Sequence, residues 1–450
     1  MFKSFIHIRS NKIFGLHNLS INFGHSNLYF KKMAKILIKN IKGLFQTGES
    51  LPAFKKGAQM DDADLLENAF LAIDGDEIMS YGKMEDWGGI TDWRDLEVID
   101  AEGKFVLPAF CDSHTHAVFA ATREEEFEDR IKGLTYEEIA LKGGGILNSA
   151  RKLQEMDEDQ LFEDALKRTN RLIEYGTGAI EIKSGYGLTT DAELKMLRVI
   201  KRLKEVSPLK IKATFLGAHA FPPEFKENHQ GYIDLMINEM LPKIHEEKLA
   251  DFIDCFCERN YFTVAEMEEL LAAGAKYNLV PKVHVNQFSI MRGVESALKF
   301  GARSVDHLEE MDAQDINALK GTDCMPTLLP GCSFFLSIPY GKAREMIEAD
   351  LPVALATDFN PGSAPSGNVQ FLLSLACAKM KMTPIEALNA VTLNSAYAMD
   401  ISDTHGSITV GKKANLIITE SMTALARIPY SFGENAVETT ILNGEIVHSK

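Results

Sequence analysis

The sequence predicts an α/β protein: a (β/α)8, TIM-like barrel that carries a small β-sandwich built from both termini. Between residues 108 and 404, apolar runs of strand length alternate with segments of helical periodicity. Strand-like segments with hairpin signals occupy residues 34–107 and 405–450. A chain of 450 residues is long enough for one large domain and a smaller one.

The terminal β segments justify the smaller domain. Asp74-Gly75 lies inside "AFLAIDGDEIMSYG" and Asn443-Gly444 lies inside "VETTILNGEIVHSK", and both dipeptides favour tight hairpins. The two segments are far apart in the sequence but alike in pattern, so we expect them to pair into one composite β-sandwich. Residues 1–33 precede this pattern, and we expect them to lie outside the fold.

The first 32 residues contain five basic residues and no acidic one, and a strand-like pattern begins after Met33. A targeting peptide also lacks acidic residues, but it is usually richer in Arg, Ser and Ala. This segment has a single Arg and no Ala. We therefore favour an upstream extension that the fold does not need, and the targeting alternative stays open.

Strand candidates between residues 105 and 358 justify the barrel. They are separated by segments such as "DAELKMLRVIKRLKEV", whose apolar residues recur at helical spacing. In such a barrel the side chains that perform chemistry lie at the carboxyl ends of the strands. In chain order the eight runs are "FVLPAF", "GAIEIKS", "IKATFLGA", "DFIDCFC", "LVPKVHV", "RSVDHL", "DCMPTLL" and "PVALATD".

Composition limits the partners. The net charge of -16 makes nucleic acid and anionic membrane poor partners for the folded body, so we expect a small-molecule substrate. No apolar run reaches the roughly 20 residues of a membrane helix. The six Cys form no Cys-x-x-Cys pair and indicate reduced thiols of a cytoplasmic protein. Cys255 and Cys257 share a strand face, which leaves a metal-binding role open. Assembly of the chain as a homodimer stays open.

Five of the 12 His stand at predicted carboxyl ends of barrel strands. His114 and His116 end the first strand, and alternate residues of a strand face the same side. A single His on an apolar strand is usually a packed core residue, but five at one rim indicate a site. The other three are His219, His284 and His307, on the third, fifth and sixth strands.

His114, His116 and His284, together with Asp358 at the end of the eighth strand, form the strongest constellation. Three imidazoles and one carboxylate suit a divalent first-row metal, zinc or iron. Such a set leaves a coordination position for water, which is typical of a catalytic metal. A metal there lowers the pKa of its water to about 7 and polarises a carbonyl group.

This pattern resembles the amidohydrolase superfamily, which joins a metal-bearing barrel to a small β-sandwich made from both termini. Members with two metals usually carry a modified bridging Lys on the fourth strand, which here reads "DFIDCFCE". The resemblance therefore implies one divalent metal per chain, Zn2+ being favoured over iron. Within the superfamily, the chain is similar to the imidazolonepropionase family in "SHTHAVFAATREEEFEDRIKGLTYEEI", "IEIKSGYGL", "TFLGAHAFPPEF", "KVHVNQFS", "SVDHLEE" and "ATDFNPGS".

The resemblance implies a step of histidine degradation: a metal-activated water hydrolyses the cyclic amide of 4-imidazolone-5-propionate to N-formimidoyl-L-glutamate. Arg123 would pair with the propionate through a bidentate contact. His219 would contact the substrate or the oxyanion. The other implied substrate-binding residues are Tyr136, Tyr186, Gln287, Asn360, Gly362 and Ser363.

Gln287 makes the proton path unusual. It lies three residues after His284, where some relatives carry Glu, and an amide cannot take a proton. Proton handling then falls to Asp358, to His307, or to both. We expect Asp358 to accept the proton of the water, while His307 polarises or protonates the substrate.

Two other functions fit parts of the sequence. A purine or pyrimidine deaminase with one metal needs an acid near the ring nitrogen, which His-x-x-Glu would supply and "HVNQ" does not. A non-enzymatic metal-binding barrel would need neither an open coordination position nor Arg123 and Tyr186. Ammonia release from a nucleobase, set against loss of the imidazolone, separates these alternatives.

Overall fold

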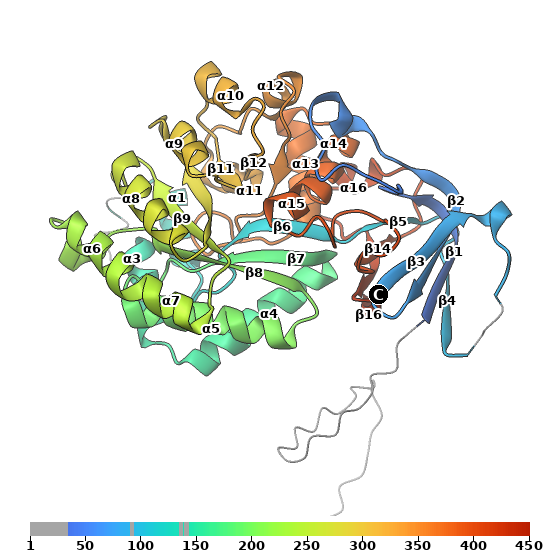
Figure 1. The fold of residues 1–450 in the computed structure, drawn as a ribbon, viewed down its shortest axis with the longest axis horizontal. Helices are drawn as coiled ribbons and strands as arrows, with labels where there is room; N and C mark the ends of the chain where they lie inside the picture. Colours follow the sequence, from blue (N-terminus) through green and yellow to red (C-terminus); the bar gives the residue numbers. More distant parts are fainter. Residues whose placement is uncertain (1–34, 91–93, 135–137, 139–143) are drawn as a thin grey trace, which may run out of the picture. The chain divides into compact units, whose positions relative to one another are not determined.

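The structure is a computed structural model that describes residues 35–90, 94–134, 138 and 144–450. Both sheets and the described helices belong to the unit Ala34–Lys450. The extension predicted over residues 1–33 lies outside the described residues. Figure 1 shows a barrel surrounded by helices and, beside it, a sheet that contains strands from both ends of this unit.

Eight parallel strands form the barrel sheet, in the order β13-β12-β11-β10-β9-β8-β7-β6. The ring closes where His116 N donates to Phe359 O at 2.9 Å and Asp358 N donates to His114 O at 3.0 Å. The predicted barrel is confirmed. Its strands are β6 (Phe110–Thr115), β7 (Thr177–Lys183), β8 (Lys210–Ala218), β9 (Phe252–Cys257), β10 (Val280–Val285), β11 (Ser304–His307), β12 (Met325–Leu328) and β13 (Ala354–Leu355).

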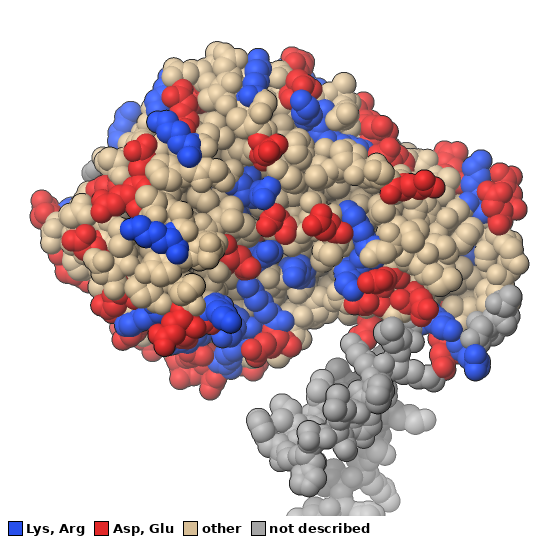
Figure 2. Space-filling view, in the orientation of Figure 1, with Lys and Arg blue, Asp and Glu red and all other residues tan. Residues whose placement is uncertain are grey.

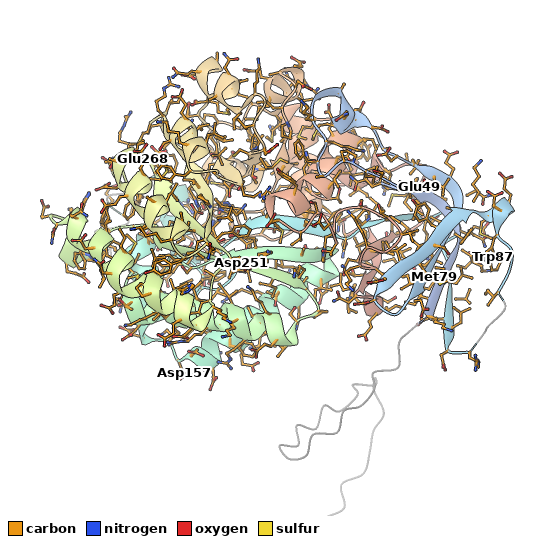
Figure 3. The ribbon with its side chains drawn as sticks, in the orientation of Figure 1. Glu49, Met79, Trp87, Asp157, Asp251 and Glu268 are labelled. Atoms are coloured by element: carbon orange, nitrogen blue, oxygen red, sulfur yellow. The ribbon has the colours of Figure 1, made fainter. Side chains whose placement is uncertain are left out.

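Helices cover the outside of the barrel, as α5 does along β8 and α8 along β9 (Figure 1). Asp157, labelled in Figure 3, caps α4 by accepting from Asp159 N at 2.9 Å. The helices are α1 (Glu124–Ile131), α3 (Gly145–Glu155), α4 (Glu158–Glu174), α5 (Thr190–Val206), α6 (His229–Leu235), α7 (Leu241–Glu247), α8 (Val264–Ala275), α9 (Gly293–Lys299), α10 (Ala313–Leu319), α11 (Pro330–Leu336), α12 (Ala343–Glu348), α13 (Val369–Met380), α14 (Pro384–Ala390), α15 (Leu393–Ala398) and α16 (Arg427–Tyr430).

The second sheet has the order β16-β15-β14-β5-β1-β2-β3, with β4 paired to β1. The predicted hairpins are present: β2 turns into β3 at Gly75, and β15 turns into β16 at Asn443 and Gly444, all with positive φ. Its strands are β1 (Lys35–Leu44), β2 (Leu66–Asp74), β3 (Glu77–Lys83), β4 (Leu96–Asp100), β5 (Phe105–Pro108), β14 (Leu416–Thr419), β15 (Val437–Leu442) and β16 (Glu445–Ser449).

The terminal sheet encloses an apolar core of its own. Ile36, Ile38, Leu71, Ile418 and Ile441 belong to this core, and each side chain is at most 1% exposed. The sheet therefore buries residues from both ends of the unit, as the predicted composite domain requires.

The prediction that "FVLPAF" is the first barrel strand is wrong. Residues Phe105–Pro108 form β5, which pairs with β1 and β14 in the terminal sheet. Pro108 has no N–H to extend a ladder, and after it Ala109 N still donates to Asn415 O at 2.9 Å. Phe110 N then donates to Gly176 O at 2.9 Å, so the chain changes sheets at Ala109.

The surface charges, the lengths of the described helices and the state of the cysteines can be compared with what the composition predicts. On the face shown in Figure 2, acidic and basic side chains are interspersed. Across the described ranges, no helix has the length and apolar character needed to cross a membrane. All six Cys are free thiols, and every one except Cys377 is buried.

Candidate metal centre

The carboxyl ends of the barrel strands bring together four imidazoles and one carboxylate. His114 Nε2 and His116 Nε2 each lie 3.6 Å from Asp358 Oδ1. The ring centroids of His114 and His284 are 4.4 Å apart, and those of His284 and His307 are 5.2 Å apart. The five side chains are at most 3% exposed. Donor atoms of His114, His116 and Asp358 lie within 4.8 Å of one another, and so do those of His114, His284 and His307. The four predicted ligands and His307 therefore form one buried cluster that is joined through His114.

His114 presents an unprotonated ring nitrogen to this cluster. Its Nδ1 lies 2.6 Å from Asp306 Oδ2, and because a carboxylate only accepts, the Nδ1 proton donates to it. Nε2 is then the unprotonated nitrogen. It is buried and has no hydrogen-bond partner among the described residues. A buried acceptor left in this way fits a metal ion bound at Nε2.

His284 is held in the same manner by Asp254. Its Nδ1 donates to Asp254 Oδ2 at 2.7 Å, and its backbone N donates to Oδ1 at 3.0 Å. Burial lowers the pKa of His114, of His116 and of His284, and the neighbouring imidazoles add to the effect on the first two. Neutral imidazole is the form that binds metal, so the site is prepared for a cation.

Lys183 joins the two carboxylates that orient these histidines. Its ammonium is fully buried, 3.0 Å from Asp254 Oδ2 and 3.8 Å from Asp306 Oδ2, and 3.2 Å from Glu181 Oε1. Burial alone would lower the pKa of Lys183, but these three carboxylates outweigh burial and raise it. The cation therefore balances negative charge inside the barrel and holds Asp254 and Asp306 in place.

Sequence reasoning missed the orienting role of Asp254, Asp306 and Lys183. A signal was available, because each stands within a strand whose residues are all buried. Charged residues are almost never fully buried without partners. Three of them on strands of one barrel indicate a shared network.

Asp358 is oriented by the loop that follows it. Ser363 Oγ donates to Asp358 Oδ2 at 3.2 Å. Asn360 Oδ1 accepts from Gly362 N at 2.8 Å and from Ser363 N at 2.7 Å, so its amide shapes the loop. Burial raises the pKa of Asp358 to about 6, although His307 opposes this, and a divalent ion would stabilise the ionised form. Asn360, predicted to line the pocket, thus uses its side chain within the loop.

Arg123 lies near the same mouth. Its Nε donates to Ser149 Oγ at 2.8 Å, and its guanidinium carbon is 5.9 Å from the centre of the Tyr186 ring. A Cβ on Gly362 would lie 2.6 Å from Arg123 Nη1, so a larger residue there would displace the guanidinium. Both guanidinium Nη atoms stay available to a ligand, because the described contacts use Nε. The geometry suits a carboxylate.

The loop that carries Tyr186 is fixed by a buried carboxylate. Glu193 accepts from Gly185 N at 2.9 Å, from Gly187 N at 2.7 Å and from Leu188 N at 2.9 Å. Tyr186 itself is 3% exposed, and its ring centroid lies 5.7 Å from that of His116. Glu193 therefore positions Tyr186 toward the histidine cluster. Tyr136, the other predicted tyrosine, lies outside the described residues.

His219 stacks on His116, with ring centroids 5.1 Å apart. Its Nδ1 donates to Gly185 O at 3.0 Å, which leaves Nε2 as an acceptor. Burial, with His284, lowers the pKa of His219 to about 3, so the ring is neutral near neutral pH. In this tautomer His219 accepts an N–H from a substrate. Donation to an oxyanion would require a further proton.

Gln287 and His307 lie at the predicted proton path. Gln287 Nε2 donates to Cys332 Sγ at 3.3 Å. His307 Nδ1 lies 3.3 Å from Glu309 Oε1. Burial opposes protonation of His307, but Glu309 and Asp358 outweigh it and raise the pKa of His307 above its ordinary value. The ring can therefore carry a proton where the Gln287 amide cannot.

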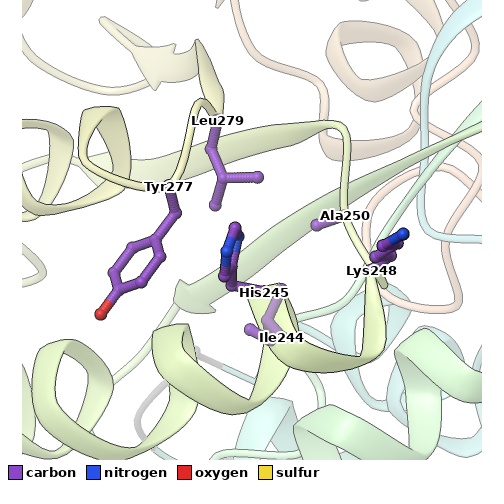
Figure 4. A pocket seen from close by; sticks show the side chains of 6 residues that line it. All are labelled: Ile244, His245, Lys248, Ala250, Tyr277 and Leu279. Atoms are coloured by element: carbon purple, nitrogen blue, oxygen red, sulfur yellow. The ribbon is translucent and has the colours of Figure 1, made fainter.

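A surface pocket of about 190 Å³ lies at the opposite end of the barrel, before β9 and β10 begin (Figure 4). It contains His245, whose ring centroid is 5.2 Å from that of Tyr277. In the part of the chain that the structure describes, no cluster of metal-binding side chains includes His245, Cys255 or Cys257. The donors that fit a metal are those at the mouth.

The chain matches the model of the amidohydrolase family over residues 105–447. It is 56% identical to the imidazolonepropionase of Flavobacterium johnsoniae over 91% of this chain and 99% of that protein. It is 53% identical to the imidazolonepropionase of Christiangramia forsetii over 92% of this chain and all of that protein.

Solved structures share the fold at low sequence identity. Guanine deaminase of E. coli aligns with a TM-score of 0.70 at 12% identity, over 93% of this chain and 100% of that one. An adenosine deaminase of Xanthomonas campestris with bound zinc aligns with a TM-score of 0.66 at 13% identity, over 92% of each chain. At these identities the likeness concerns the fold alone.

Proposed function

The chain belongs to the amidohydrolase family and, within it, to the imidazolonepropionases, and we propose from this premise that its barrel mouth hydrolyses 4-imidazolone-5-propionate to N-formimidoyl-L-glutamate. Water adds a hydroxyl group to the ring carbonyl carbon, the bond from that carbon to the ring nitrogen breaks, and a proton from the water ends on the nitrogen. This is the third step of histidine degradation.

His114, His116, His284 and Asp358 would hold the divalent metal of this reaction. When bound, such an ion polarises a carbonyl group and lowers the pKa of water. We propose one ion per chain, with Zn2+ favoured over iron, because three neutral imidazoles and one carboxylate match a catalytic zinc set. The support is the pair of orienting bonds at His114 and His284, which leave Nε2 of each ring as the unprotonated nitrogen.

Substrate binding falls to the side chains around this cluster. Arg123 pairs with the propionate carboxylate through its Nη atoms. Tyr186, held by Glu193, closes one side of the ring pocket, and the His219 Nε2 acceptor takes a ring N–H. Ser363 keeps one Asp358 oxygen in place while the other faces the histidines. The arrangement fixes the substrate ring over the reacting carboxylate.

Proton transfer divides between two groups. Asp358 accepts the proton of the attacking water, and His307, whose pKa is raised, protonates the departing nitrogen. Gln287 contributes hydrogen bonding only, since an amide does not ionise in this range. The alternative to test is a nucleobase deaminase, which needs an acid near the ring nitrogen that "HVNQ" does not supply.

The convergence of buried, oriented imidazoles carries this proposal, and metal content tests it. His284→Ala and Asp358→Ala should each lose bound metal and nearly all turnover of the imidazolone, measured as substrate loss and N-formimidoyl-L-glutamate formed. His245→Ala, a surface change at the far end of the barrel, is the matched control and should keep both. Full turnover in a metal-free variant would contradict the proposal. Ammonia released from a nucleobase by the parent would favour a deaminase.

A further inference from the structure

A second group of buried donors lies beside the predicted ligand set. His307, Glu309 and Cys332 each offer one ligand atom, and these atoms lie within 4.8 Å of one another. The three residues are 3%, 3% and 0% exposed. Glu309 and Cys332 have no part in the proposed reaction.

The carboxylate of Glu309 is incompletely satisfied. Its Oε1 accepts from Ser333 Oγ at 3.4 Å and lies 3.3 Å from His307 Nδ1. Its Oε2 is buried, lies 3.2 Å from the same nitrogen without hydrogen-bond geometry, and has no hydrogen-bond partner within the described ranges. A buried carboxylate oxygen without a partner is costly, so this atom is available to a cation.

The backbone holds these donors at an energetic cost. His307 has φ of 85° and Leu308 has φ of 62°, and neither is Gly. Consecutive left-handed residues are strained and persist where the surrounding structure imposes them. Here they are His307 itself and the residue that joins it to Glu309, so the strain falls on the segment that carries both donors. Cys332 reaches the same place from α11.

We propose that His307, Glu309 and Cys332 form a second cation site, which takes a thiolate-binding divalent ion such as Zn2+ and inhibits the enzyme when filled. Imidazole, carboxylate and thiolate together are a zinc set, and they exclude hard cations such as Mg2+. On binding, a sulfur–metal bond forms at Cys332 and the thiol proton is released to solvent. Gln287 Nε2, 3.3 Å from Sγ, donates to the resulting thiolate.

Inhibition follows from the shared histidine, and this half of the inference rests on the proposed function. An ion on His307 Nδ1 displaces the proton that Nδ1 donates to Glu309, and the ring can then no longer deliver a proton to the departing nitrogen. The first ligand set contains no sulfur. A thiolate–metal signal therefore reports the second site alone.

Cobalt titration tests the site. Protein freed of metal with a chelator should bind two equivalents of Co2+ per chain, and the second should bring the near-ultraviolet charge-transfer absorption of a cobalt thiolate. Cys332→Ser should lose that absorption and the second equivalent while keeping the first. Glu309→Gln should weaken the second equivalent by at least about tenfold. Cys324→Ser, a buried thiol at the other end of β12, is the matched control and should keep both.

Three results decide the matter. A single equivalent without thiolate absorption overturns the second site and leaves the proposed function standing. Binding of no Co2+ at all overturns both proposals. For the inhibition, imidazolone turnover should fall as Zn2+ exceeds one equivalent in the parent and in Cys324→Ser, and should resist that excess in Cys332→Ser. Equal inhibition of all three would overturn the inhibitory role.

Discussion

Asp254→Asn should loosen the metal centre without changing any of its predicted ligands. Asp254 Oδ1 accepts from Cys255 N at 2.7 Å and from His284 N at 3.0 Å. An asparagine oxygen can keep both bonds. Its Nδ2 would then replace Oδ2 and face two donors, His284 Nδ1 at 2.7 Å and Lys183 Nζ at 3.0 Å.

Two donors cannot satisfy one another, so His284 is expected to change tautomer. Its Nδ1 would accept from the new amide, and its proton would move to Nε2, the nitrogen that faces the metal. Loss of such an outer hydrogen bond costs about 10- to 100-fold in metal affinity, or about 1.4–2.7 kcal/mol. Lys183 keeps Glu181 and Asp306, so the loss of one charged partner should destabilise the fold by about 1.5–3 kcal/mol.

Competition with a chelator measures the metal dissociation constant, and thermal unfolding measures stability. Asp251→Asn is the control: Asp251, labelled in Figure 3, accepts from Ala213 N and Lys204 Nζ, both at 2.8 Å, at the amino end of β9. It should change stability but leave metal affinity alone. Parental metal affinity in Asp254→Asn would refute the claim that this carboxylate sets the His284 lone pair.

Three substitutions test other parts of the site, and a truncation tests the N-terminal segment. Arg123→Gln removes a charge-assisted contact worth about 1.5–3 kcal/mol, so kcat/KM should fall by roughly one to two decades at unchanged metal content; an unchanged kcat/KM would remove Arg123 from the substrate site. His307→Gln should lower kcat by about 10²–10⁴. Because the pKa of His307 is raised and its protonated form is the active one, the parent should lose activity as pH rises through that pKa, and the variant should lack this alkaline limb. Gln287→Ala should lower activity without moving either limb of the pH–rate profile. If the His307 or the Gln287 variant behaves otherwise, the proton path must be assigned to other groups. A chain that starts at Met33 should fold and turn over as the full chain does, and an insoluble or inactive product would show that residues 1–32 are needed.

The sequence alone determined the barrel, the terminal sheet and the positions of the donor side chains. These features are local: apolar periodicity marks each strand, and Asp-Gly or Asn-Gly marks each hairpin. Residue chemistry marks His114, His116, His284 and Asp358 as donors at strand ends. The parallel barrel then places all strand ends at one mouth, so their meeting follows from topology without any knowledge of distances.

Only the tertiary structure decided which ring nitrogen of each donor histidine is protonated and which carboxylate holds the ring in place. The proton on His114 is set by Asp306, which lies 192 positions away in the sequence, and the proton on His284 is set by Asp254 on the neighbouring strand. The division of "FVLPAF" between two sheets depends on Asn415 and Gly176, whose carbonyl oxygens accept from Ala109 N and Phe110 N, respectively. Likewise, Cys332 joins Glu309 and His307 only because α11 lies against the loop after β11, where Ser333 Oγ donates to Glu309 Oε1. Which side chains meet between the strands of the closed barrel depends on strand register and on side-chain rotamers. No local sequence pattern encodes either, so the hydrogen-bond network around the ligands became visible only in the tertiary structure.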